Sequence, residues 1–263
     1  MASSPPARPA TRSRPRLDQA LALLDLHGDT LAAFVFEPLV QGAAGMRMHS
    51  AAYLPDPRPG GAGAGVLLVA DEVAVGFGRL GTLFAMEQVG LSPDFLCLAK
   101  GIAAGYLPLA ATLTTDAVYD AFLAEPAAYR QLFHGHTFTG NPLACAVALE
   151  SLALFDRDDV LRHVRRLEHA LGEALAELRA LRWVTSIRHR GVMVGIQLAQ
   201  PDGTAFPPDQ TVGHRVAMAT RGLGAITRPL GDTLVLNPPL SLSLDEAHAL
   251  VDIAGRAIRE VLG

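Results

Sequence analysis

Residues 66–100 read VLLVADEVAVGFGRLGTLFAMEQVGLSPDFLCLAK and contain two short apolar runs, each followed by a charged residue. The first run, 66–70, comes after a glycine-rich stretch and is typical of a buried strand that delivers Asp71 at its end. The second run, 95–98, ends shortly before Lys100. Because ligands bind at the carboxyl ends of strands in open α/β sheets, the pattern predicts a site that contains both residues. Taken singly, the aspartate indicates a loop acid and the lysine a solvated strand end.

The composition fits a globular chain with one or two domains. Half of the 263 residues are apolar and the formal net charge is −4. This charge gives no basic footprint for nucleic acid, and no apolar run approaches the roughly 18 residues of a membrane span. We therefore expect neither nucleic acid nor membrane as a partner. Cys97 and Cys145 lie in apolar surroundings, which indicates small buried thiols in a reducing, cytoplasmic compartment.

The alternation of apolar runs and helical patterns predicts an α/β unit over residues 17–155 and a smaller α+β unit over 156–263. Residues 1–16 hold four arginines, four prolines and no acid, which favours a disordered tail over a targeting peptide. The prolines and glycines of 54–65 predict that no helix forms there.

Capping residues and the spacing of apolar residues predict where the helices and strands lie. Asn141 before Pro142 predicts a helix start, and Ser243 with Glu246 forms a capping box. The 4-3 apolar spacing after residue 158 indicates core packing, with a coiled coil as the alternative. We expect a glycine-rich turn at 40–46. Helices are expected over 17–27, 116–123, 141–155, from 158, over 211–221 and from 243, and strands over 31–36, 66–70, 95–98, 109–114, 184–188, 192–198, 225–227 and 233–236.

Two further motifs are discounted. His134 and His136 form an H-x-H pair, but no third ligand stands at a useful spacing, so we expect no metal site. The glycines of 60–65 resemble a phosphate loop, yet they precede a strand, whereas a phosphate cradle opens a helix.

Asp71 and Lys100, with Gly76-Phe77-Gly78-Arg79 between them, resemble the cofactor core of the class III pyridoxal-phosphate (PLP) aminotransferases. The resemblance implies part of a fold type I large domain at 17–155 and a small C-terminal domain at 156–263. It implies that Asp71 pairs with the pyridine nitrogen of PLP, that Val73 packs on the ring, and that Lys100 carries the cofactor covalently and serves as general base. Glu72 is interpreted as structural.

The string HGHTFTGNP extends the resemblance to a partner subunit. Thr137 matches the family position that gives a hydroxyl and an amide to the cofactor phosphate of the neighbouring subunit, which implies a homodimer. The alternative is an ordinary loop threonine.

The strings PLVQGAAGM, DFLCLAKG, GYLPLAATLTT and HGHTFTGNPLACA resemble the biotin-pathway branch of this family. That branch converts the keto acid 8-amino-7-oxononanoate into 7,8-diaminononanoate with S-adenosylmethionine as amino donor. The resemblance assigns Arg228, Gly135 and Arg79 to substrate binding, with Arg228 holding the keto-acid carboxylate. A surface arginine paired with Asp232 is the alternative. The ω-amino acid:pyruvate aminotransferases share an Arg-Pro at this place and are the alternative function.

The family carries a longer N-terminal part, which holds a phosphate-cradling loop and a ring-stacking aromatic, and neither is found here. Residues 1–16 and 54–65 match nothing in the family. We therefore expect an N-terminally truncated member with impaired activity; a local shift of the reading frame or a truncation of the gene is the hypothesis for the two unmatched stretches. A non-catalytic remnant of the family is the second alternative.

Overall fold

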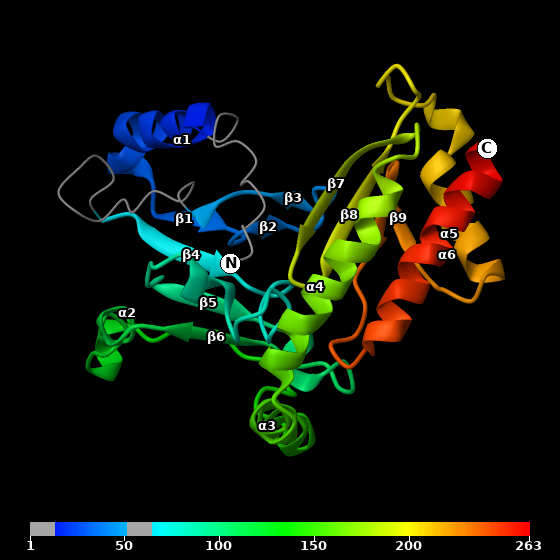
Figure 1. Cartoon of the computed structure of the whole chain (residues 1–263). Coiled ribbons are helices and arrows are strands. Elements are labelled where there is room, and N and C mark those ends of the chain that lie inside the picture. Colours follow the sequence, from blue (N-terminus) through cyan, green and yellow to red (C-terminus); the bar gives the residue numbers. More distant parts are fainter. Residues whose placement is uncertain (1–13, 52–64) are drawn as a thin grey trace, which may run out of the picture.

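The computed structural model describes residues 14–51 and 65–263, and two sheets organise this part of the chain (Figure 1). The expectations of a tail before residue 14 and of a helix-free stretch at 54–64 lie outside the described residues. The first predicted helix is present as α1 (Arg14–His27), and it begins three residues before the first apolar residue of its stripe.

The first sheet has the order β1-β4-β5-β6. Its strands are β1 (Ala33–Phe36), β4 (Leu67–Asp71), β5 (Phe95–Leu98) and β6 (Ala111–Thr114). β1, β4 and β5 are parallel, and β6 pairs with β5 in the antiparallel sense. The carboxyl ends of the three parallel strands therefore lie together at one edge, as the sequence predicted.

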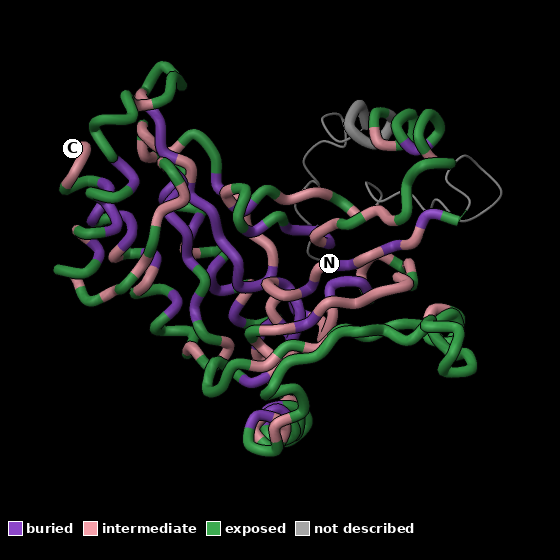
Figure 2. Tube along the Cα trace, turned by 180° about the vertical axis from the view of Figure 1, so that it is seen from behind, coloured by how far each residue is buried: buried purple, intermediate pink, exposed green. Residues whose placement is uncertain are grey.

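This sheet is less buried than its apolar sequence predicts. Leu68 and Ala70 of β4 are fully buried, but Val35 in β1 is 65% exposed and Leu113 in β6 is 51% exposed. Figure 2 shows β6 and the segment that follows it as a largely exposed path. Within the described residues no helix packs broadly on these strands. The prediction of buried strands is therefore wrong for β6 and for Val35 of β1, because no described helix packs broadly on the strands there.

Short helices connect the strands, and a long one follows them. α3 (Pro142–Arg157) begins as predicted, because the Asn141 side chain accepts a hydrogen bond from the backbone N–H of Ala144 at 2.9 Å. α3 packs against the turn that begins at Lys100. The remaining elements of this region are η1 (Gly28–Thr30), η3 (Ala85–Gln88), η4 (Lys100–Ala103), α2 (Asp116–Asp120) and η5 (Pro126–Ala128).

The second sheet is antiparallel, with the order β7-β8-β10-β9. Its strands are β7 (Val184–Arg190), β8 (Met193–Leu198), β10 (Thr233–Leu236) and β9 (Arg228–Leu230). The strand predicted at 225–227 is wrong, since β9 begins at Arg228. Pro229 is tolerated in β9 because this is an edge strand that pairs only with β10.

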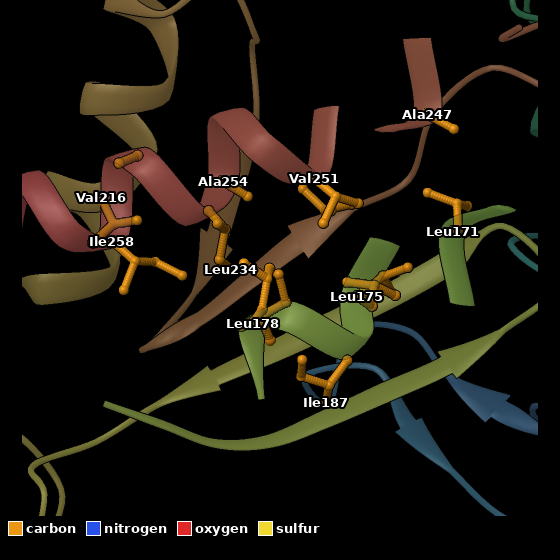
Figure 3. Packing of buried hydrophobic residues seen from close by; sticks show 14 of the residues in the cluster. Leu171, Leu175, Leu178, Ile187, Val216, Leu234, Ala247, Val251, Ala254 and Ile258 are labelled. Carbon is orange, nitrogen blue, oxygen red and sulfur yellow. The ribbon is translucent and has the colours of Figure 1, made fainter. Parts of the chain in front are cut away.

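Three helices cover this second sheet, and their apolar faces form the main core (Figure 3). They are α4 (Val160–Leu178), α5 (Val212–Gly222) and α6 (Leu244–Leu262), with η6 (Pro208–Gln210) before α5. The predicted 4-3 stripe of α4 buries Val164, Leu167, Leu171 and Leu178 in this core, so core packing is confirmed over the coiled coil.

A hairpin missed by the sequence analysis joins the two sheets. β2 (Val40–Gln41) and β3 (Arg47–Met48) flank the predicted glycine-rich turn. Arg188 of β7 donates from Nε to the Met46 carbonyl at 3.0 Å and from a terminal nitrogen to the Gly45 carbonyl at 2.8 Å. A second core cluster fills the junction between the hairpin and the second sheet; its buried members are Leu39, Val40, Met46, Val75, Leu80, Ala85, Met193 and Val235.

Candidate active site

The segments that carry Asp71 and Lys100 lie side by side. Asp71 is the last residue of β4 and stands in register with Cys97 of the neighbouring parallel strand. The backbone N–H of Glu72 donates to the Cys97 carbonyl at 2.9 Å, which extends the pairing past the strand end. Lys100 follows β5 after one intervening residue, Ala99, and is the first residue of η4. The fold thus places a carboxylate and an amine at adjoining strand ends.

Asp71 makes one local contact and keeps one oxygen available. Its Oδ1 accepts a hydrogen bond from the backbone N–H of Val73 at 3.0 Å. In the part of the chain that the structure describes, Oδ2 has no hydrogen-bond partner. The side chain is half-buried. The observed bond matches the loop-acid interpretation, and the second oxygen keeps its capacity to accept a hydrogen bond.

Lys100 is held in an unusual backbone conformation. Its φ is +45°, in the left-handed region that non-glycine residues adopt at a cost of about 1–2 kcal/mol. The residue is exposed and forms no ion pair with any described residue. It is also the one lysine of the chain. Strained backbone of this kind clusters at functional sites.

Glu72 is fully buried, in contrast to its neighbour. Its two carboxylate oxygens accept the backbone N–H groups of Ala85 and Met86, each at 2.7 Å. Burial raises the pKa of Glu72, and the two hydrogen bonds oppose that shift. The side chain thereby closes the loop 72–88, which agrees with the structural interpretation given to it from the sequence.

Arg79 was predicted to bind substrate, but in this structure it forms hydrogen bonds with other parts of the chain. Its guanidinium donates to the Pro238 carbonyl, and its own carbonyl accepts the Val192 N–H at 3.1 Å. Burial lowers the pKa of Arg79 to about 10. These contacts join the loop to the second sheet. A substrate contact of Arg79 stays a prediction.

Gly135 and Thr137 lie in an exposed loop before α3. His134 and His136 stand edge to face with ring centroids 4.9 Å apart. Among the described residues, no three His, Cys, Asp or Glu side chains gather in a way that would hold a metal ion. Nor does any described helix have the length and apolar character needed to cross a bilayer.

Arg228 is exposed at the start of β9, opposite Val235 of β10. Asp232, its alternative partner, instead accepts the Gly213 N–H at 3.0 Å, and no ion pair joins it to Arg228 among the described residues. A groove of about 390 Å³ is lined by Thr227 and Val235, the chain neighbour and the cross-strand partner of Arg228, and by Asn237, Pro238, Glu246 and Leu250, among others; Arg228 itself is not part of the lining. Sequence reasoning did not identify this groove, because it forms between residues distant in the chain.

Comparison with known proteins extends these observations. A family model described as aminotransferase class-III matches residues 9–258. The adenosylmethionine-8-amino-7-oxononanoate aminotransferase of Nitratidesulfovibrio vulgaris is 49% identical, over 95% of this chain and 47% of that protein. The protein of the same name from Geobacter sulfurreducens is 43% identical, over 97% of this chain and 57% of its own length.

Solved structures agree on the fold. The adenosylmethionine-8-amino-7-oxononanoate aminotransferase of Methanocaldococcus jannaschii aligns with a TM-score of 0.86 at 36% identity, over 94% of this chain and 58% of that one. An (S)-enantioselective omega-transaminase from Thermomicrobium roseum also gives 0.86, at 32% identity, over 95% of this chain and 56% of that one. The chain spans about half the length of the relatives that it matches. The predicted fold class is confirmed.

Proposed function

Because the chain belongs to the class III aminotransferases, we propose that it serves PLP-dependent transamination, converting 8-amino-7-oxononanoate into 7,8-diaminononanoate in biotin biosynthesis. The placement of Asp71 and Lys100 at adjoining parallel strand ends is the observation that carries this proposal. The names of the most similar curated relatives support the choice of reaction.

The donor set fits PLP. A carboxylate beside a pyridine nitrogen keeps that nitrogen protonated, and Asp71 offers its Oδ2 for this purpose. The Lys100 amine is the only side-chain group of the chain that could hold the cofactor covalently and then move a proton as general base. Val73, whose N–H binds Asp71, would pack on the face of the ring, as the family resemblance implies. When bound, PLP supplies the electron sink for the reaction at the amino carbon.

The substrates and partner are proposed on narrower grounds. Arg228 is exposed and unpaired among described residues, and Thr227 and Val235 next to it line the groove, so its planar guanidinium is free to hold the keto-acid carboxylate with two hydrogen bonds. S-adenosylmethionine is the proposed donor. Thr137 is proposed to reach the cofactor phosphate of a second subunit in a homodimer, and the cytoplasm is the proposed location. An ω-amino acid:pyruvate aminotransferase remains the second candidate, because an omega-transaminase matches the fold equally well.

Covalent labelling of Lys100 tests the cofactor proposal. PLP followed by borohydride should add the cofactor to the peptide that contains Lys100, and Lys100→Ala should abolish this adduct because no other lysine exists. Lys100→Arg is the matched control, since it keeps the charge but has no reactive amine. Peptide mapping that finds the label only at the amino terminus would contradict the assignment.

Arg228→Ala tests the substrate proposal in a chain joined to the N-terminal half of a relative. Apparent affinity for the keto acid should fall about 10- to 100-fold, the loss expected for one charged contact of about 1.5–3 kcal/mol. The half-reaction with S-adenosylmethionine should change much less. Equal losses in both half-reactions would indicate a folding defect, and no loss in either would remove Arg228 from the substrate site.

A further inference from the structure

Glu72 is the fully buried carboxylate next to the residue proposed to meet the cofactor. Both of its oxygens bond to the N-terminus of η3, and its own carbonyl accepts the Gly76 N–H at 2.9 Å. One side chain therefore fixes both ends of the loop 72–88. Charge-assisted hydrogen bonds to backbone N–H groups are stronger than neutral ones, so this closure is stiff.

The same loop reaches the backbone of Lys100. Phe77 is 4% exposed, and its ring meets the ring of Phe84 edge to face at 5.6 Å. A Cβ on Gly101 would lie 2.8 Å from the Phe77 Cβ, so the chain after Lys100 packs directly on Phe77. Only glycine fits at position 101. The strained φ of Lys100 is thus held by a contact that originates in the loop closed by Glu72.

We propose that Glu72 is a positioning residue: by closing the loop it presses Phe77 against Gly101 and fixes Lys100 relative to Asp71. The inference rests on the proposed function for its purpose. Its structural content, that Glu72 orders the backbone around Lys100, is independent of any cofactor.

The charged group near Glu72, Glu87, does not close the loop 72–88 in its place. Glu87 is the charged neighbour that acts on Glu72, and it raises the pKa of Glu72. Glu87 itself caps the same turn by accepting the Phe84 N–H at 2.7 Å, but it is exposed. Glu87 therefore provides a matched control. Its carboxylate also accepts a backbone hydrogen bond at η3, but the side chain is exposed and does not join the two ends of the loop 72–88.

Two measurements on the full chain test the proposal. Amide hydrogen exchange should rise in Glu72→Ala about tenfold or more at Ala85 and Met86, and also at Ile102 and Ala104, which bond within the turn of Lys100. Borohydride trapping of PLP at Lys100 should slow about tenfold in the same variant. Glu72→Gln keeps one acceptor oxygen, so its exchange and trapping rates should lie between those of the wild type and Glu72→Ala. Glu87→Gln should match the wild type in both measurements.

The outcomes separate the two hypotheses. Unchanged exchange at Ile102 and Ala104, or unchanged trapping in a variant with altered exchange, would overturn the positioning role. If the wild type itself gains no adduct at Lys100, the proposed function fails, and exchange alone decides the structural coupling. Should Glu72→Ala not fold, Glu72→Gln and Phe77→Leu give the same readout, since each weakens one link between Glu72 and Gly101.

Discussion

At the scale of single residues, Asp71 and Glu72 are adjacent at a strand end, yet their carboxylates have different environments and different proposed roles. Successive side chains of a strand point to opposite faces. One oxygen of Asp71 has no described partner, whereas Glu72 is buried and both of its oxygens accept hydrogen bonds from backbone N–H groups. Burial without those bonds would disfavour the charged form strongly. The pair thus combines an available carboxylate with a fixed one.

His189 gives a residue-scale prediction about pH. Its Nε2 donates to the Gly191 carbonyl at 2.8 Å, and burial lowers its pKa below the ordinary value of about 6.5, with Arg179 adding to the shift and Glu168 opposing it. The unfolded chain therefore binds the proton first. Stability should rise with pH until about 6.5 and be lost below it, with a slope of at most about 1.4 kcal/mol per pH unit.

His189→Gln should flatten this part of the pH profile, measured by urea unfolding between pH 5 and 8. The control is His169→Gln, whose ring is exposed and pairs with Glu173 on the surface. An unchanged slope in His189→Gln would assign the pH dependence to another group.

The positions of Asp71 and Lys100 at strand ends could be predicted from the sequence, because each follows an apolar run of its own. The contact between Phe77 and Gly101 could not, since it depends on how the loop folds back once Glu72 is buried. Arg79 carries no sequence signal for its bond to the Pro238 carbonyl, which lies in a distant segment.

At the scale of elements, α6 supplies a test of capping. Ser243 Oγ accepts the Glu246 N–H at 3.2 Å, and Glu246 accepts the Ser243 N–H at 2.8 Å in return. α6 packs against both α4 and α5, so fraying at its start weakens the main core. Ser243→Ala should lower the free energy of unfolding by about 1 kcal/mol, measured by urea denaturation.

Ser241→Ala is the control for that measurement, because Ser241 is an exposed serine just before the cap with no described hydrogen bond. Equal effects of the two substitutions would show that the capping box contributes nothing specific. The double variant with Glu246→Ala should lose little more than Ser243→Ala alone, since the two bonds form one unit.

Elements with local start signals were predicted well, and those fixed by distant contacts were not. The caps at Asn141 and Ser243 mark the observed helix starts. β2 and β3 have two residues each and form where Arg188 meets the backbone carbonyls of Gly45 and Met46, a contact across most of the chain. β9 was placed too early because its position is set by pairing with β10 and not by its own apolar residues.

At the scale of the whole molecule, arginines hold the two sheets together through backbone carbonyls. Arg188 bonds to the hairpin, Arg79 to Pro238, and Arg165 to the Gly81 carbonyl at 3.3 Å. A guanidinium presents several donors in a fixed plane, so each contact sets an orientation as well as a distance. The proposed cofactor residues lie on one side of this junction and Arg228 on the other.

The region from Tyr106 to Leu152 leaves many large apolar side chains exposed. Figure 2 shows it as an exposed path that runs from β6 to α3. When such side chains gather into one patch, the patch marks an interaction site or promotes aggregation. Its most exposed members are Tyr106, Tyr129, Leu132, Phe133, Phe138, Leu143 and Leu149.

The last prediction concerns that surface. The chain should associate with itself in sedimentation velocity runs as its concentration rises, because covering a leucine or phenylalanine gains about 1.5–3 kcal/mol each. Phe133→Ser combined with Leu149→Lys should weaken this association about tenfold or more.

Leu26→Lys is the control: Leu26 is equally exposed, but it lies on α1, away from α3 (Figure 1). If the chain stays monomeric at every concentration, the surface is not a site of association, and the proposed homodimer loses its support. If Leu26→Lys has the same effect as the double variant, association is driven by apolar exposure in general. A loss confined to the double variant would place the contact on the side of the molecule that holds Thr137, as the proposed sharing of a cofactor phosphate between subunits requires.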